Sequence, residues 1–433
     1  MVKQILKSIV VFILTLEARI VLWKYRPTII AVTGSVGKTT VKDAIVFALS
    51  KSFFVRGSAK SFNSELGVPL TVLGCESGGW ESVRAWLSII GEGLALIAFQ
   101  NHYPKVLVVE VGTDKPGDIA RITRWLKPNV AVVTRVGDVP VHVEFFSSRS
   151  ELIAEKGNIV GALKANGIAV LSADDPDVIS MRTRAPYAKI FTYSMTGSAD
   201  VTGSDADLFY SKEGVPMGVE CVATYAGENA PLIIKGTANF SALHGALAAC
   251  AVAIVLGAPF QETVRAFESF TVPKGRSRLI EGIRGSIIID DTYNASPAAV
   301  AAALDALGRI DTGGRKIAIL GDMLELGKHS VEAHKKMGVH ASEVADILIT
   351  VGLRSEVAGA EAELCGMYKE DVHHFTDSVA AGEFLKMVVK DHDVVLVKGS
   401  QRVRMERIVE RIMAHPEQKH NLLVRQEEAW QDR

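Results

Sequence analysis

Several features that would assign a chain of 433 residues to a specialised class are scarce in this sequence. The net charge is only −1, so no excess of basic residues indicates a nucleic-acid partner. The four cysteines are too far apart for a metal-ligand spacing or a disulfide framework, as in proteins of a reducing cytosol: Cys75, Cys221, Cys250 and Cys365. With 48% hydrophobic and 22% charged residues, the composition predicts a globular protein of two or three domains.

The sequence also lacks an apolar run long enough to span a membrane. Ile9–Leu16 is apolar but is followed by Glu17 and Arg19, whereas a spanning helix needs about 20 mostly apolar residues. No small-residue cleavage site follows before residue 28, which argues against a secretory signal. We expect an apolar helix within residues 1–27, in a cytoplasmic protein. The helix either packs on the protein body or lies peripherally on the inner face of the membrane, where its basic residues suit an anionic surface.

The most informative segment that is present is Thr33–Thr40, which reads TGSVGKTT. It follows a strand-like run, Thr28–Val32, and precedes a helical pattern, which is the order of a phosphate-binding loop. Val32 stands where the general pattern has its first glycine, so the loop is a variant. Lys38 is expected to reach the outer phosphates of ATP, and the Thr39 hydroxyl to ligate magnesium. The residues predicted to cradle the nucleotide are Gly34, Ser35, Gly37, Lys38, Thr39 and Thr40.

Strand-like runs alternate with helical patterns in two parts of the chain, which predicts an α/β protein with two such domains. Residues 28–272 are predicted to form a central phosphate-loop ATPase domain with a mostly parallel sheet. Residues 273–433 are predicted to form a C-terminal Rossmann-like α/β domain, with a polar, peripheral end at residues 415–433. A second apolar helical stretch, Trp86–Phe99, is expected to pack against the N-terminal helix.

Five further positions have side chains suited to chemistry, each with a plainer explanation beside it. Glu110 ends a strand-like run, where a carboxylate near a phosphate loop is either a magnesium ligand or a solvated strand end. His142 and Lys156 are single residues of types that are usually structural or solvated. Asp290 and Asp291 end another strand-like run and suit ribose or metal binding, or the capping of a following helix.

Taken together, these segments resemble the Mur ligase family, the ATP-dependent amide ligases of peptidoglycan precursor synthesis. The likeness extends over roughly residues 28 to 410. Its motifs are TGSVGKTT, SFNSELGVPLT from Ser61, EVG at Glu110, HVEFFSS from His142, EKGNI at Lys156, GRSR at Arg276, DDTYNASP from Asp290, GDMLELG from Gly321 and VKGSQRVRME from Val397.

The resemblance implies specific roles for residues of this chain. Lys38, Lys156 and His142 would be catalytic, with Lys156 carbamylated. Two magnesium ions would be held by Thr39, Glu110, His142 and Lys156. Besides the phosphate loop, the residues implied to contact ATP are Asn239, Arg276, Asp291 and Asn294.

The implied reaction joins D-alanyl-D-alanine to a nucleotide-linked cell-wall precursor through an acyl phosphate. The branch of the family with this activity has an N-terminal UDP-binding domain, which we expect to be lacking because residues 1–27 alone precede the first strand. Two alternatives stay open: a ligase of the same fold with another acceptor, such as a folate-type glutamate ligase, and a membrane-associated ATP-binding protein without ligase activity.

Overall fold

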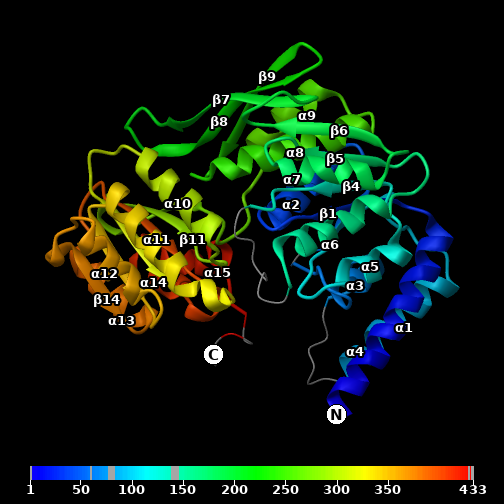
Figure 1. Cartoon of the computed structure of the whole chain (residues 1–433), viewed down its shortest axis with the longest axis horizontal. Coiled ribbons are helices and arrows are strands. Elements are labelled where there is room, and N and C mark those ends of the chain that lie inside the picture. Colours follow the sequence, from blue (N-terminus) through cyan, green and yellow to red (C-terminus); the bar gives the residue numbers. More distant parts are fainter. Residues whose placement is uncertain (1, 59–60, 77–82, 138–145, 428–429, 431–433) are drawn as a thin grey trace.

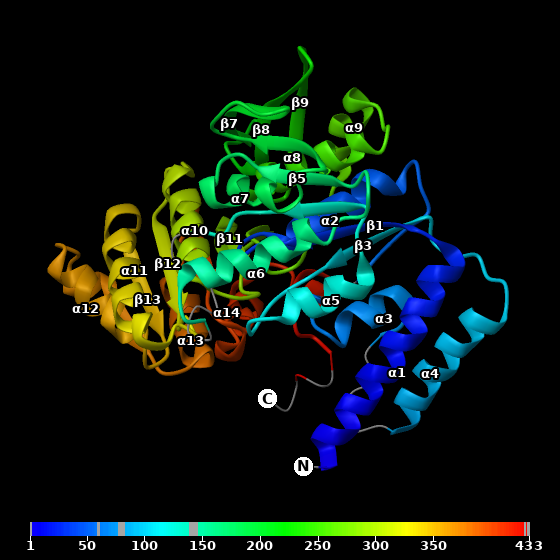
Figure 2. The same cartoon turned by 45° about the vertical axis from the view of Figure 1, so that its right-hand side comes forward.

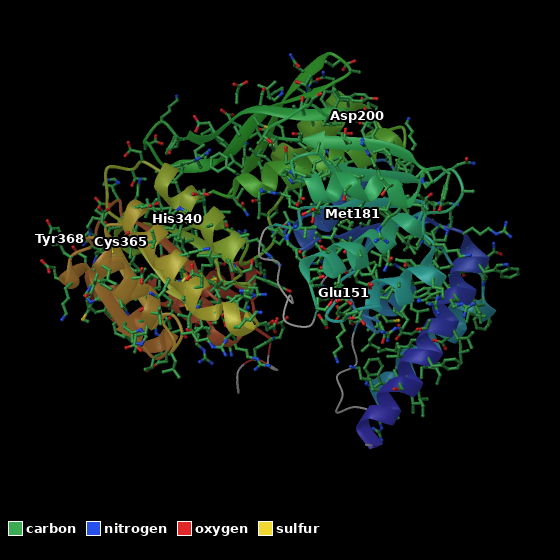
Figure 3. All side chains as sticks on the ribbon, viewed as in Figure 1. Glu151, Met181, Asp200, His340, Cys365 and Tyr368 are labelled. Atoms are coloured by element: carbon green, nitrogen blue, oxygen red, sulfur yellow. The ribbon has the colours of Figure 1, made fainter. Side chains whose placement is uncertain are left out.

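The chain folds around two β-sheets that lie side by side, each covered by helices (Figure 1). The computed structural model describes residues 2–58, 61–76, 83–137, 146–427 and 430. Within these residues no helix is long and apolar enough to cross a membrane. All four cysteines are free, and the exposed Cys365 lies at the outer edge of the second sheet's helices, near Tyr368 (Figure 3).

The larger sheet has nine strands in the order β2-β3-β1-β4-β5-β6-β7-β8-β9. The strands from β2 to β7 pair in parallel, and β7, β8 and β9 form an antiparallel extension. The strands are β1 (Thr28–Thr33), β2 (Val55–Gly57), β3 (Val106–Glu110), β4 (Val130–Val133), β5 (Ile168–Ser172), β6 (Lys189–Ser194), β7 (Val201–Tyr210), β8 (Pro216–Tyr225) and β9 (Glu228–Lys235).

Alternation along the buried strands divides their side chains between two hydrophobic cores. Ile30 and Val32 of β1 belong to the core under α2 and α8, whereas Ile29 and Ala31 belong to the core under α1, α3 and α5. The helices of this part are α1 (Val2–Tyr25), α2 (Lys38–Ser50), α3 (Gly67–Leu73), α4 (Val83–Ala98), α5 (Asp118–Leu126), α6 (Arg149–Gly161), α7 (Pro176–Ser180), α8 (Phe240–Val255) and α9 (Phe260–Ala266).

The smaller sheet has six strands in the order β10-β11-β15-β12-β13-β14, parallel except for the β10–β11 pair. Its strands are β10 (Arg278–Glu281), β11 (Ile287–Asp291), β12 (Lys316–Gly321), β13 (Ile347–Val351), β14 (Val372–Phe375) and β15 (Val394–Lys398). Its helices are α10 (Pro297–Arg309), α11 (Ser330–Val344), α12 (Glu356–Leu364), α13 (Ser378–Val388), α14 (Glu406–Ile412) and α15 (Lys419–Leu422).

Helices α1 and α4 form a parallel pair that projects from the larger sheet (Figure 2). Lys24, near the end of α1, donates hydrogen bonds from Nζ to the carbonyl oxygens of Leu96 (2.9 Å) and Ile97 (3.1 Å) in the last turn of α4. A lysine there satisfies carbonyl groups that have no partner inside the helix. The predicted packing of the two apolar helices is therefore confirmed.

The predicted α/β class, with a mostly parallel first sheet, is confirmed. The predicted peripheral end is confirmed at the exposed residues 415–418 but is wrong at Leu423 and Arg425, which are buried. The Arg425 guanidinium donates from Nη1 to Glu406 Oε2 (2.8 Å) and to the carbonyl oxygen of Thr292 (3.1 Å). A buried arginine needs such partners, and they lie far from it in the sequence.

Candidate active site

A cavity of about 370 Å³ lies where the loops of the two sheets meet. From the side of the larger sheet it is lined by the loop after β1, the end of β3 and α6. From the side of the smaller sheet it is lined by Arg276 and the segment Tyr293–Ser296. The carboxyl ends of parallel strands are the usual position of ligand sites in α/β sheets.

The loop between β1 and α2 has the geometry of a phosphate-binding loop. Gly34 lies against Thr134, the residue after β4, since a Cβ on Gly34 would come within 1.9 Å of Thr134 Oγ1. Gly37 adopts a left-handed φ of 81° at the start of α2, a conformation that favours glycine. The backbone N–H groups of the first helical turn thus face the cavity, which is the arrangement that binds phosphate oxygens.

Two lysines converge on this loop, of which Lys156 is buried and Lys38 half-buried. Lys38 Nζ and Lys156 Nζ each donate a hydrogen bond to the Gly34 carbonyl oxygen, both at 3.0 Å. Burial lowers the pKa of Lys38. Burial, together with the positive charge of Lys38, holds the pKa of Lys156 well below its usual range. Lys156 comes from α6, the helix whose first turn carries Glu151 (Figure 3).

Glu110, at the end of β3, meets the phosphate loop on its other side. Glu110 accepts hydrogen bonds from Thr39 Oγ1 (2.9 Å, to Oε2) and from Asn63 Nδ2 (3.1 Å, to Oε1). Thr39 Oγ1 also lies 2.8 Å from Ser61 Oγ. The carboxylate and the two hydroxyl groups are oxygen donors, the type that magnesium prefers, so these residues fit that ion. Among the described residues no group of three or more His, Cys, Asp or Glu side chains is placed to hold a metal.

The smaller sheet contributes a guanidinium and an aromatic ring. The Arg276 guanidinium lies over the Tyr293 ring, 4.0 Å from its centroid, and both line the cavity with Asn294. Tyr293 OH donates to Ser61 Oγ at 3.4 Å, which links the two halves of the site directly. A stacked guanidinium loses little freedom on binding an anion, which suits it to phosphate recognition.

Two side chains named from the sequence lie outside the cavity lining. Asp291 is buried beside the cavity, where it accepts hydrogen bonds from Lys398 Nζ (2.6 Å) and the Ser277 backbone N–H (3.1 Å). Asn239 does not line the cavity but caps α8, accepting from the Ser241 backbone N–H at 2.8 Å. His142 lies outside the described residues. Of the nucleotide-binding, catalytic and metal residues named from the sequence, those that line the cavity are Ser35, Gly37, Lys38, Thr39, Thr40, Glu110, Lys156, Arg276 and Asn294.

The sequence reasoning did not single out several cavity residues that the fold brings there. Ser61 and Asn63 lie in the SFNSELGVPLT segment, and Tyr293 lies in DDTYNASP. Both motifs were part of the family resemblance, but no role was assigned to these three side chains. The available signal was their place inside the motifs, beside residues to which a role was assigned.

Two parts of the chain match known protein families. Residues 32–253 match the Mur ligase middle domain, and residues 275–401 match the Mur ligase glutamate ligase domain. This chain belongs to the Mur ligase family. The two matches contain most of the cavity residues of both halves, from Ser35 to Gln401.

Individual Mur ligases are similar over most of this chain. The UDP-N-acetylmuramoyl-tripeptide–D-alanyl-D-alanine ligase of Mycobacterium leprae is 31% identical over 407 residues, covering 87% of this chain and 71% of the relative. The enzyme of that name from Bacillus subtilis is 28% identical over 390 residues, covering 90% and 76%. The crystal structure of Thermotoga maritima MurF ligase in complex with ADP has a TM-score of 0.75 at 28% identity, covering 93% of this chain and 83% of that one.

Proposed function

We propose that this chain is an ATP-dependent ligase that forms an amide bond between a peptide carboxylate of a nucleotide-linked cell-wall precursor and the amino group of D-alanyl-D-alanine. The observation that carries the proposal is the convergence of Lys38, Lys156 and Glu110 on one cavity, opposite Arg276. Two relatives named for this reaction, and an ADP-bound structure of the same fold, support it.

The reaction has two steps in this proposal. A carboxylate oxygen of the precursor attacks the γ-phosphorus of ATP, the bond to the β-phosphate oxygen breaks, and ADP leaves. The amino nitrogen of D-alanyl-D-alanine then attacks the carbonyl carbon of the acyl phosphate, loses a proton, and inorganic phosphate leaves with the C–O bonding electrons. The site must hold both reactants in line and exclude water, because an acyl phosphate hydrolyses readily.

The residues of the phosphate loop neutralise charge in this scheme. Lys38 supplies a positive charge beside the transferred phosphoryl group, and Arg276 supplies another from the opposite side. Thr39 and Glu110 would hold one magnesium ion, and Glu110, His142 and carbamylated Lys156 a second. When bound, magnesium offsets the negative charge of the phosphate oxygens. The proposed role of His142 rests on the resemblance to the family.

Lys156 is well suited to carbamylation. Only a neutral amine attacks carbon dioxide, and burial, which lowers the pKa of Lys156, raises the share of that form. The nitrogen forms a bond to carbon, one proton is released, and the resulting carbamate offers two oxygen atoms to a cation. We expect Lys156→Ala to lose nearly all ligation and to be partly rescued by short carboxylic acids. Full activity in the variant and in bicarbonate-free enzyme would contradict carbamylation.

Recognition of the nucleotide is proposed to come from both halves of the site. Arg276 and Asn294 line the cavity with the phosphate loop. Asp291 lies behind them and orients Lys398 and the Ser277 backbone next to Arg276. The proposed contact of Asn239 with the adenine side needs its side chain to leave the α8 cap, a cost of about 0.5–2 kcal/mol.

The outer face of α1 supports a cytoplasmic enzyme that rests peripherally on the inner membrane surface. Its exposed apolar side chains are three or four residues apart and form one stripe: Leu6, Ile9, Phe12, Leu16, Ile20 and Trp23. Exposed Arg19 and Arg26 flank the stripe, as expected for contact with anionic lipid. Flotation with anionic and neutral vesicles tests this contact. Leu16→Glu is expected to weaken it and Lys51→Glu, on the protein body, to leave it unchanged.

The proposed activity is tested by phosphate release from ATP with purified enzyme. We expect release only when a precursor peptide and D-alanyl-D-alanine are both present, with an equal amount of amide product. Release with glutamate and a folate-type acceptor instead would favour another ligase of this fold. Release that needs neither substrate would indicate an ATP-binding protein without ligase activity.

A further inference from the structure

A second cavity, of about 920 Å³, adjoins the nucleotide cavity. The two share Asn63, Gly112 and Asp114 in their linings. Asn63 and Gly112 are in contact where the two linings meet. The Gly112 backbone N–H donates to the Asn63 carbonyl oxygen at 2.8 Å, and a Cβ on Gly112 would come within 2.9 Å of the Asn63 side chain. The volume is within the range of about 300–1,000 Å³ that is usual for small-molecule sites.

Helix α1 forms one wall of this second cavity. Lys7, Ser8, Val11, Phe12 and Thr15 line it, opposite residues of α5 and of the segment after Ser61. Four of these positions form a face of the helix between the buried face, which packs on the protein, and the exposed apolar stripe. Phe12 belongs both to that stripe and to the cavity lining. All of α1 precedes residue 32, where the match to the Mur ligase middle domain begins.

The lining contains basic and acidic side chains, which suits a molecule that carries both positively and negatively charged groups. Its basic side chains are Lys7, Lys115 and Arg121, and its acidic ones are Glu65, Asp114 and Asp118. Phe12 and Trp125 add aromatic surface, which suits the apolar face of a sugar or of a peptide side chain.

Arg121 anchors the far wall of the cavity. Its Nη1 lies 2.5 Å from Glu65 Oε1, and its Nη2 lies 3.3 Å from Asp118 Oδ1. The pairing holds the guanidinium across from α1, with the remaining N–H groups available for a carboxylate.

We propose that this second cavity binds the acid substrate of the ligase, a glycan-linked peptide with free amino and carboxylate groups, and that α1 is its substrate-binding wall. The inference rests on the proposed function. A peptide in this cavity can extend its reacting carboxylate past the shared lining residues Asn63, Gly112 and Asp114 toward the phosphate loop. The other substrate, ATP, occupies the first cavity, so the two reactants meet at Glu110 and Lys38.

The proposal predicts that changes on the cavity face of α1 weaken the acid substrate alone. Thr15→Trp would fill the cavity beside Phe12, and Lys7→Glu would reverse one of its charges. For both variants we expect KM for the precursor to rise at least about tenfold, with the affinity for ADP unchanged. Lys7→Arg keeps the charge and is expected to restore KM.

Matched controls lie on the same helix but outside the cavity. Arg19→Glu makes the same charge reversal on an exposed residue, and Leu16→Trp adds similar bulk on the apolar stripe. Both are expected to keep the wild-type KM for the precursor. Equal effects of the control and cavity variants would show that α1 acts only through stability or membrane contact, and would overturn the proposal.

Direct binding separates this inference from the proposed function. The probe is UDP-N-acetylmuramoyl-tripeptide, titrated calorimetrically into the full chain loaded with ADP. Binding by wild type that is lost in Thr15→Trp, with an unchanged Tm, supports the second cavity even if turnover is absent. Absence of binding by wild type, or equal binding by Thr15→Trp, overturns the inference, whereas a ligase assay that still succeeds would leave the proposed function standing.

Discussion

Replacing Gly112 by alanine is expected to damage the site through a single methyl group. The new Cβ would lie 2.9 Å from both Cγ and Nδ2 of Asn63, closer than carbon and nitrogen atoms tolerate. The Gly112 backbone N–H donates to the Asn63 carbonyl oxygen at 2.8 Å, so the two backbones are held together. The Asn63 side chain must therefore rotate away, and its 3.1 Å hydrogen bond to Glu110 is lost.

The size of the effect follows from that hydrogen bond. A hydrogen bond to a charged group contributes about 1.5–3 kcal/mol, which corresponds to a fall of about 10- to 150-fold in kcat/KM if the bond is needed at the transition state. The assay is steady-state phosphate release with both substrates, beside a thermal melt. Gly91→Ala is the control, because nothing lies within 4 Å of the Cβ that it would add on α4.

Asn63→Ala separates this explanation from general damage. It removes the same hydrogen bond without adding a methyl group, so Gly112→Ala and Asn63→Ala should have similar effects and should not add in the double variant. Full activity of Gly112→Ala, or losses of activity that add in the double variant, would refute the role given to the Asn63–Glu110 hydrogen bond.

Three further changes test other parts of the structure. Lys38→Ala should lower turnover by about 10²–10³-fold at unchanged Tm, because a charge beside the transferred phosphoryl group is removed; near-normal ligation would contradict that role. Burial beside Gly93 raises the pKa of Glu17 to about 7, so the folded chain binds a proton that the unfolded chain has released between pH 4.5 and 7. Stability should therefore fall as pH rises through this window, and thermal melts of Glu17→Gln should lose that slope. Arg425→Ala leaves Glu406 short of a buried partner and frees the Tyr293 loop, so chemical unfolding should show a loss of about 3–5 kcal/mol, less where Arg404 compensates.

Much of the fold was determined by local sequence pattern. Buried parallel strands such as Val106–Glu110 and Val394–Lys398 are short runs of apolar residues, and their type does not depend on distant partners. The phosphate loop was equally evident, since Gly37 needs a left-handed backbone and Lys38 must follow it at the start of a helix.

Only the tertiary structure decided which side chains share the site. Tyr293 and Ser61 are 232 residues apart and meet at 3.4 Å, and no periodicity in the sequence encodes such a pairing. Asn239 and Asp291 carry groups suited to nucleotide binding. In the fold, however, Asn239 caps α8 and Asp291 accepts a hydrogen bond from Lys398, because these donors lie within hydrogen-bonding distance of them.

The N-terminal helix shows the same division. Its apolar character and its packing with α4 followed from the sequence. Both stretches are rich in apolar side chains, and packing the two helices together removes part of that apolar surface from water. The face of α1 that contains Lys7 and Thr15 lines the second cavity. This position depends on where α5 and the segment after Ser61 lie in space. Sequence pattern determines which faces a helix has, whereas the surrounding fold determines what each face meets.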